Sequence, residues 1–480
     1  MRRTLAAWLL LAVAACGGGS GGSGGDSPGA NSPALASATS AALQVAPLVW
    51  PRDVFAEVAG VISLSAYGGD GKATWSVECG TGLDCDVVDG RLRLVSTADA
   101  GPARVAVTLK VSDGLGARAS TTQSITAWPK AITQGMRSLA GAADRPGLHL
   151  LILGDGFSQE ELHAFHTVAA NFMDQFFSHP EIAAHRGAWN VHVADLVTHV
   201  DPVSKVRAPS PLGARLGCQN IPRLLCVETG RAQKIASLFL PHYTQVLVIS
   251  NHAEYGGSGG LVASITRHPT AVPAAVHELG HSFAGLGDEY VEENAVSAFF
   301  FEGLYPNVTA TTDRGQVPWS HWIEARTAVP TLMAPALGAD IVGLYEGALL
   351  VHQGRFRPTF DSLMRSIGSP MGPVNGEAWA RRVYARGGAW AQVAPATDAV
   401  LPRSAQPAGG WLFKAQPLLD GSIAQTRWYV DGVERTPQRG ANQLLVPAAG
   451  ALQVRVDLVD LTGRVRQDQG LVSSLNWGVP

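Results

Sequence analysis

The sequence HELGH, which begins at His277, constrains the fold of this chain more than any other stretch. An α-helix repeats every 3.6 residues, so a helix here places His277 and His281 on one face, with Glu278 beside the first of them. Pro273 suits the first turn of such a helix, and Gly285 is a suitable stop, so we predict that the helix ends just before Gly285. Burial of two imidazoles and a carboxylate without partners is costly. This helix is therefore either exposed to solvent or buried with partners for these three side chains.

The two histidines have the H-E-x-x-H spacing of a zinc site, in which neutral imidazole nitrogens bind the metal. Zinc with an open position lowers the pKa of water toward neutrality, and Glu278 is placed to take the proton as general base. The sequence therefore predicts one catalytic Zn²⁺ per chain, with His277 and His281 as ligands and Glu278 as the catalytic residue.

A third protein ligand is needed, and several carboxylates follow the motif. The metzincin pattern places this ligand after a glycine turn, six residues beyond the second histidine, whereas Asp288 is the seventh residue after His281. We predict Asp288 as the ligand, because a carboxylate oxygen suits zinc and the turn at Gly285 can bring it under the metal. Glu289 is the neighbouring alternative. A glutamate from a later helix is a further one, with these candidates: Glu292, Glu293 and Glu302.

Several segments together resemble a bacterial metallopeptidase family named after a clostridial IgA protease. They are LGDGF at 153–157, YGGSGG at 255–260, HELGHSFAGLGDEY at 277–290, YEGA at 345–348 and RPTFDSLMR at 357–365. The resemblance covers about residues 145–390 and implies a zinc endopeptidase with His277 and His281 as ligands and Glu278 as base. In the last segment, Met364 resembles the methionine of the metzincin Met-turn, which packs beneath the metal; an ordinary core methionine is the alternative. Cleavage of IgA does not follow from the resemblance.

The N-terminus has the features of an export signal. Arg2 and Arg3 precede an apolar stretch at residues 5–15 that is too short to span a membrane. It ends in VAACG, which resembles a bacterial lipobox, so we predict cleavage before Cys16 and lipid attachment to its thiol; a plain signal peptide is the alternative. Residues 17–44 are largely Gly and Ser at their start and are predicted to be a flexible linker. The expected location is the bacterial membrane, on the outer membrane or cell surface.

The other four cysteines form two pairs that are close in sequence. Cys79 is near Cys85, and Cys218 is near Cys226. Because an exported chain permits disulfides, we predict bonds Cys79–Cys85 and Cys218–Cys226. Zinc binding by these pairs is the alternative, but neither has the C-x-x-C spacing.

Length and pattern predict several domains, because 480 residues exceed one ordinary core. Alternating strands with Gly and Asp turns predict an Ig-like β-sandwich at residues 45–130, and a second small all-β sandwich is predicted at residues 391–480. Residues 131–390 alternate buried strands with helices, which predicts an α/β (α+β) domain. The resemblance implies that this domain is a metzincin-like zinc peptidase domain. Within it we predict an edge strand at residues 260–265 and irregular structure at residues 291–387.

The signals together predict a lipid-anchored, zinc-dependent endopeptidase that acts on extracellular protein. The expected partners are a protein or peptide substrate, with host glycoproteins such as immunoglobulin among the candidates, and the membrane through the lipid anchor. A substrate strand is expected to add to the edge strand at residues 260–265. Tyr290 and Tyr345 are candidates for binding an oxyanion, although packing is favoured for both.

Two alternative functions stay open at the sequence level. One is an inactive surface adhesin or glycan-binding protein, and the other is a zinc amidase that acts on peptidoglycan. Nucleic acid is not an expected partner, because a formal net charge of -3 gives no general attraction to phosphate.

Overall fold

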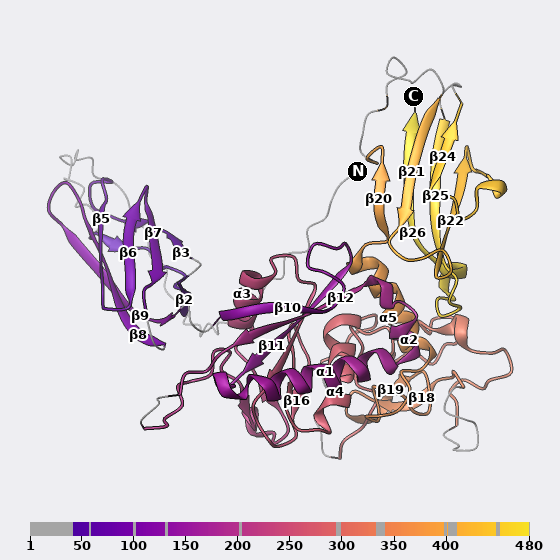
Figure 1. Ribbon diagram of the computed structural model, residues 1–480, viewed down its shortest axis with the longest axis horizontal. Coiled ribbons are helices and arrows are strands. Elements are labelled where there is room, and N and C mark those ends of the chain that lie inside the picture. The colour runs from indigo at the N-terminus through magenta and orange to yellow at the C-terminus, as the bar shows by residue number, and fades with distance from the viewer. Residues whose placement is uncertain are drawn as a thin grey trace, which may run out of the picture.

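The computed structural model describes residues 42–56, 59–98, 102–129, 133–200, 204–293, 299–332, 341–397, 401, 410–447 and 452–479. Cys16 and most of the predicted linker lie outside the described residues. Figure 1 shows a central body of helices around a sheet, with a group of strands on either side of it. The architecture is α+β and largely β. Among the described residues, none of the helices has the length and apolar character needed to cross a membrane.

The first part of the described chain forms two packed sheets. Their orders are β2-β9-β8-β5 and β3-β7-β6, and apolar side chains that alternate along β7 and β8 fill the space between them. The Cys79–Cys85 disulfide joins the two sheets, since β5 ends at Cys79 and Cys85 lies in β6. The strands are β1 Gln44–Val45, β2 Asp53–Phe55, β3 Gly60–Ser63, β4 Ala66–Tyr67, β5 Thr74–Cys79, β6 Leu83–Val88, β7 Arg91–Ser96, β8 Ala103–Ser112 and β9 Arg118–Trp128.

The central sheet has the order β10-β12-β11-β15-β17-β16. Its four inner strands run parallel to one another, and β10 and β16 are antiparallel edge strands. The inner strands are buried along almost their whole length because helices cover both faces of the sheet. The bounds are β10 Thr133–Ala140, β11 Leu148–Asp155, β12 Trp189–Leu196, β15 Gln245–Ser250, β16 Gly257–Ser258 and β17 Ala263–Thr266.

One face of the central sheet packs on α1 Leu162–Ser178, α4 Ala271–Leu279 and α5 Pro373–Gly387, with the short α2 Pro180–Ala183 beside them. The other face packs on α3 Thr229–Phe239, where Phe55 and Trp128 of the N-terminal sheets join the same apolar cluster. Asp53 accepts a hydrogen bond from the Trp128 indole (2.8 Å) and pairs with Arg231 of α3 (3.0 Å). The N-terminal sheets are therefore attached to the central body by both apolar and polar contacts.

Two predictions for the central body are wrong. Residues 260–265 do not form an edge strand, because β17 pairs with β15 on one side and with β16 on the other. The glycine-rich run before β17 folds back onto it and takes the edge position. Residues 291–387 are not irregular throughout, since they contain β18 Tyr345–Ala348, β19 Val351–Arg357 and α5. The apolar side chains of α5 have helical spacing, but Asn375 and Gly376 near its start are poor helix formers and weaken the sequence signal.

The C-terminal strands form a second pair of packed sheets, with the orders β20-β21-β24 and β23-β22-β25-β26. Trp428 and Trp477 stack in the core between them, with ring centroids 6.0 Å apart. Asp460, at the end of β25, accepts a hydrogen bond from Tyr384 of α5 and pairs with His185, both at 2.8 Å. The strands are β20 Trp390–Ala394, β21 Trp411–Pro417, β22 Ala424–Val430, β23 Val433–Glu434, β24 Gln443–Val446, β25 Leu452–Asp460 and β26 Leu471–Val479.

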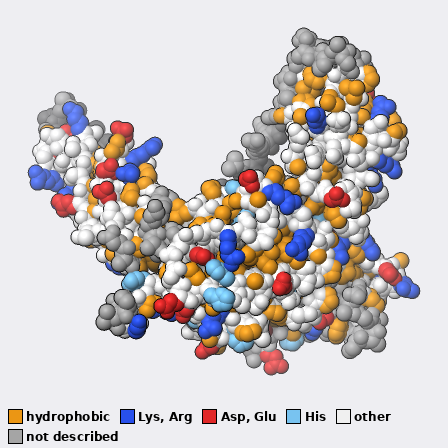
Figure 2. Space-filling model, in the orientation of Figure 1, with side chains coloured by type: hydrophobic (Ala, Val, Ile, Leu, Met, Phe, Trp, Pro, Cys, Tyr) orange, Lys and Arg blue, Asp and Glu red, His pale blue; other side chains and the backbone are white. Residues whose placement is uncertain are grey.

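The surface of the central body carries charges of both signs. On the face shown in Figure 2, Lys and Arg side chains are interspersed with Asp and Glu side chains. This mixed distribution agrees with the small formal net charge of -3.

Two buried histidines link neighbouring strands of the central sheet. His149 Nδ1 lies 3.0 Å from His192 Nε2, and the second imidazole also contacts the Ser138 hydroxyl at 2.9 Å. Burial, with a smaller contribution from the neighbouring imidazoles, lowers the pKa of His192 to about 4 and also lowers the pKa of His149. The His192 side chain is therefore neutral in the folded protein near pH 6.

We expect the stability of the protein to fall as the pH drops from about 6.5 to about 4, because His192 takes up a proton in the unfolded chain before it does so in the folded one. The full contribution is present above pH 6.5 and is lost toward pH 4. An H192Q variant should show a weaker dependence of Tm on pH in this window, by about 5 °C. The exposed His163 gives the control H163Q. Equal pH dependence in H192Q and the wild type would contradict the expectation.

Candidate metal centre

The motif helix is buried in the central body. α4 Ala271–Leu279 continues into a single π-helical turn, Gly280–Ala284, which ends at Gly285 with φ 71°. This left-handed conformation favours glycine, which explains why the helix stops there. Phe283 packs between Trp189 and Trp379, with ring centroids 4.9 Å from each. The alternative of an exposed motif helix is therefore wrong, and the polar side chains of the motif need a partner.

Three potential ligand atoms meet at one point above this helix. His277 Nε2 and His281 Nε2 are 3.1 Å apart, and Asp288 Oδ1 lies 3.3 Å from the first and 3.2 Å from the second. A tetrahedral ion with bonds of about 2.0–2.1 Å requires ligand atoms about 3.3 Å apart, so the triangle has the size that zinc needs. Glu278 adds a carboxylate close by, since His277, Glu278 and His281 place ligand atoms within 4.8 Å of one another.

The electrostatics of this triangle favour a cation. Asp288 Oδ1 is buried, and among the described residues no N–H or O–H group is aligned to hydrogen-bond it. Burial disfavours a charged imidazole, but the Asp288 carboxylate outweighs this effect and raises the pKa of His281 to about 9. The two nitrogens and the oxygen therefore fit a zinc ion both in spacing and in charge.

Two backbone carbonyls orient the histidines. His277 Nδ1 lies 3.0 Å from the Leu363 carbonyl oxygen, and His281 Nδ1 lies 2.7 Å from the Leu286 carbonyl oxygen. Since a carbonyl can only accept, each Nδ1 carries a proton, and each Nε2 is the nitrogen that would bind a metal ion. This is the tautomer that a metal-binding imidazole requires.

Glycines make room for Glu278 and His281. A Cβ atom at Gly259 would lie 3.1 Å from Glu278 Oε2 and 2.9 Å from His281 Cβ, and one at Gly257 would lie 3.4 Å from Glu278 Oε1. The segment Gly257–Gly259 is thus a backbone wall beside the carboxylate. Burial raises the pKa of Glu278, against the opposing effect of the two imidazoles.

The structure separates Asp288 from the other carboxylates that the sequence left open as ligands. Glu289 is fully buried and accepts hydrogen bonds from Asn307 Nδ2 (2.9 Å), Asn375 Nδ2 (2.9 Å) and Ser362 Oγ (2.7 Å). The others have different surroundings: Glu292 pairs with Arg223, Glu293 is exposed, and Glu302 bonds Thr309 and the Ala310 amide. Of the five candidates, the structure brings Asp288 to the histidines.

Met364 lies beneath the motif helix and is fully buried. Its sulfur would be 2.7 Å from a Cβ atom at Gly280, so this glycine allows the thioether to pack closely. The backbone around Met364 contacts both sides of the centre, since the Leu363 carbonyl accepts from His277 and the Met364 carbonyl accepts from the Glu289 amide (2.8 Å). The position is the one that the resemblance to a Met-turn implies.

Sequence reasoning missed Arg223, which lies in the loop closed by the Cys218–Cys226 disulfide. Its guanidinium pairs with Glu292 and lies 5.9 Å from the centroid of the Tyr290 ring. No local motif marks this arginine in the sequence, because its partners come from a segment about seventy residues later. Of the two tyrosines considered for oxyanion binding, Tyr290 lies beside His277, with ring centroids 6.5 Å apart. Tyr345 is buried and bonds the carbonyl of Ile341.

Two histidines on one helix, one buried and one half-buried, with an aspartate and a glutamate close by, are typical of metal-dependent hydrolases. Residues 138–336 match the family model described as IgA Peptidase M64, which confirms the family resemblance seen in the sequence. The match supports a metallopeptidase, and zinc is the typical metal of this family. The matched residues include the whole ligand triangle and end before Met364.

The comparisons with curated proteins and with solved structures give no further information on function. No curated protein matches the chain. Among solved structures, a "Chimeric titin Z1Z2 functionalized with a KLER exogenous peptide from decorin" is 17% identical, with a TM-score of 0.14. The alignment covers 24% of this chain and 55% of that one, so the chain spans about half the length of the titin structure.

Proposed function

We propose that this chain is a zinc-dependent endopeptidase in which Glu278 is the general base. The observation that carries the proposal is the triangle of His277 Nε2, His281 Nε2 and Asp288 Oδ1, with edges of 3.1–3.3 Å and with Glu278 beside it. A non-catalytic binding protein has no need for a half-buried glutamate next to such a ligand set, because removal of its charge from water is costly.

The residues of the chain have separate tasks in this mechanism. His277, His281 and Asp288 would hold the zinc ion, which supplies the Lewis acidity that makes water more acidic and polarises a carbonyl. Glu278 takes the proton from the attacking water and passes it to the nitrogen of the leaving amine. The Leu363 and Leu286 carbonyls keep the imidazoles in the required tautomer.

The substrate backbone is proposed to run along the segment Gly257–Gly259. This segment lies at the edge of the central sheet, and Gly257 and Gly259, which face Glu278, have no side chains. β17 is paired on both sides and cannot accept a substrate strand, and Gly257 already forms a bridge with Leu224, so the substrate is proposed to pass at the Gly259 end of this segment. Extracellular protein as the substrate and lipid attachment at Cys16 are parts of the proposal that rest on the sequence.

Removal of zinc tests the proposal. The purified chain is expected to hold about one zinc ion, to digest casein, to lose this activity to a chelator and to regain it on addition of Zn²⁺. Muropeptides serve as the second substrate, and their cleavage in place of casein would indicate an amidase. A folded chain that binds less than about one zinc ion, with a Tm unaffected by chelator, would support the adhesin alternative.

A further inference from the structure

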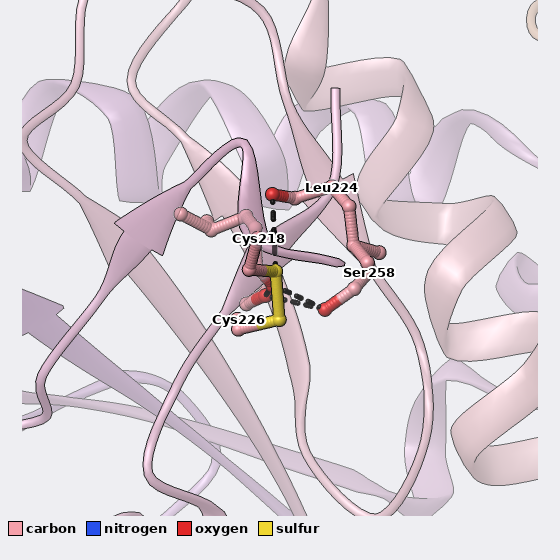
Figure 3. The surroundings of a disulfide bond; sticks show 6 residues. Cys218, Leu224, Cys226 and Ser258 are labelled. Atoms are coloured by element: carbon pink, nitrogen blue, oxygen red, sulfur yellow. Dashed lines mark hydrogen bonds between the residues drawn. A yellow bond between two sulfur atoms is a disulfide. The ribbon is translucent and has the colours of Figure 1, made fainter. Parts of the chain in front are cut away.

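The loop between β13 Arg215–Leu216 and β14 Leu225–Cys226 is docked on the edge of the central sheet. Figure 3 shows the disulfide that closes this loop, beside the Leu224 carbonyl and Ser258 of β16. The Ser258 hydroxyl donates to the Leu225 carbonyl oxygen at 2.6 Å, and Ser264 of β17 donates to the same oxygen at 3.0 Å. The loop is therefore bonded to the strand that passes next to the catalytic glutamate.

Arg223 belongs to this docked loop through its main chain. Its carbonyl oxygen accepts a hydrogen bond from the Gly257 amide at 3.1 Å, and the next residue, Leu224, pairs with Gly257 as a parallel bridge. Gly257 in turn faces Glu278, as its missing Cβ atom would lie 3.4 Å from Oε1. The backbone of Arg223 thus contacts Gly257, which in turn lies next to Glu278, the proposed general base.

The side chain of Arg223 reaches the opposite wall of the metal centre. Its guanidinium forms an ion pair with Glu292 and lies 5.9 Å from the centroid of the Tyr290 ring, and both residues lie within four positions after Asp288. Arg223 therefore connects two walls, one that contacts Glu278 and one that carries Asp288.

A purely stabilising role does not account for this arrangement. The side chains of Arg223 and Glu292 are 54% and 43% exposed, and ion pairs with this exposure contribute little to stability. The positive charge also acts on Tyr255 and on Glu278, which lies beside the proposed metal ligands.

We propose that Arg223 is a positioning residue that holds the Asp288–Glu292 segment at a set distance from the Gly257–Gly259 wall, and that the Cys218–Cys226 disulfide keeps Arg223 in place. The assignment rests on the proposed peptidase function. It makes a loop that is remote in sequence from the HELGH motif a part of the catalytic machinery.

An R223M variant with zinc bound tests the assignment. Loss of the connection lets the two walls move apart, and misplacement of about 1 Å lowers catalysis by roughly 10- to 100-fold. The expected loss is mainly in kcat, with zinc content and Tm close to those of the wild type. R223K keeps a charge for Glu292 but lacks the planar guanidinium that lies beside the Tyr290 ring, and is expected to be intermediate. Wild-type kcat/KM in R223M, or loss of its zinc, overturns the assignment.

A double-mutant cycle with Y290F separates positioning from direct contact with substrate. If Arg223 acts through Tyr290, the R223M/Y290F enzyme is no slower than R223M alone. Additive losses would place the guanidinium on the substrate and overturn the positioning role.

The proposed role of the Cys218–Cys226 disulfide can be tested with the Cys79–Cys85 disulfide as a control. C218S/C226S is expected to lose activity as R223M does, whereas C79S/C85S, in the N-terminal sheets, keeps it. Full activity in C218S/C226S would overturn the role of this disulfide. Failure of the peptidase function itself is distinguishable, since the zinc-loaded wild type would then be inactive.

Discussion

Replacement of Glu278 by glutamine is expected to lower kcat/KM for a protein substrate by roughly 10²- to 10⁴-fold while zinc stays bound. Glutamine has the shape of glutamate but cannot accept a proton from water. The atoms proposed to hold zinc belong to His277, His281 and Asp288, and none of them is altered. The measurement is digestion of casein by E278Q, with the zinc content of the same sample determined by metal analysis.

The matched control for E278Q is E324Q. Glu324 has a side chain that is 67% exposed and pairs with Arg326, so the same chemical change there should leave kcat/KM at the wild-type value. A zinc-loaded E278Q enzyme that digests casein as fast as E324Q would show that Glu278 is not the base. Loss of zinc from E278Q would instead assign Glu278 to the metal shell.

Replacement of Asp288 by asparagine is expected to weaken zinc binding by at least about 100-fold, since even residues one shell further out contribute 10- to 100-fold. An amide is neutral and cannot balance the charge of the ion, although it keeps the size of the side chain. Zinc titration into chelator-treated protein measures the change. Activity is expected to return only at high zinc concentration.

E289Q distinguishes Asp288 from its neighbour. Glu289 accepts hydrogen bonds from two asparagine amides and from Ser362, and a glutamine would place an NH₂ group against donors. An unmatched buried donor costs about 1–3 kcal/mol, so a lower Tm with unchanged zinc affinity is expected. The reverse result, with E289Q losing zinc and D288N keeping it, would exchange the two assignments.

Local patterns were sufficient for much of the central body. The segments at residues 148–153, 189–196 and 245–250 predict strands, and the structure contains them as β11, β12 and β15. Ser158, a residue type that favours helix starts, caps the turn that leads into α1 through a capping box with Glu161. These features depend on residues that are close in sequence, so they can be predicted from the sequence alone.

The failures have a different cause. The strand at residues 260–265 was predicted to be an edge strand because its own sequence does not indicate which segments pair with it. The pairing with Gly257–Ser258 depends on a tight fold-back through glycines, and the docking of the disulfide loop depends on contacts with Leu224 and Leu225. α5 was missed because its apolar face is recognisable only once the surfaces that bury it, including Trp189 and Phe176, are in place.

The same division applies to the metal centre. The sequence by itself determined His277, His281 and Glu278, because their relation is a matter of helical periodicity within five residues. Both Asp288 and Glu289 stayed candidates for the third metal ligand, because no spacing rule distinguishes the two residues. Only the tertiary structure decided between them, since Asn307, Asn375 and Ser362 come from distant segments and hold Glu289 away from the histidines. Arg223 likewise meets Tyr290 and Glu292 only after folding. Helical spacing depends on residues that are close in sequence. The side chains that surround a metal site come from distant segments, so the tertiary structure decides which of them reach it.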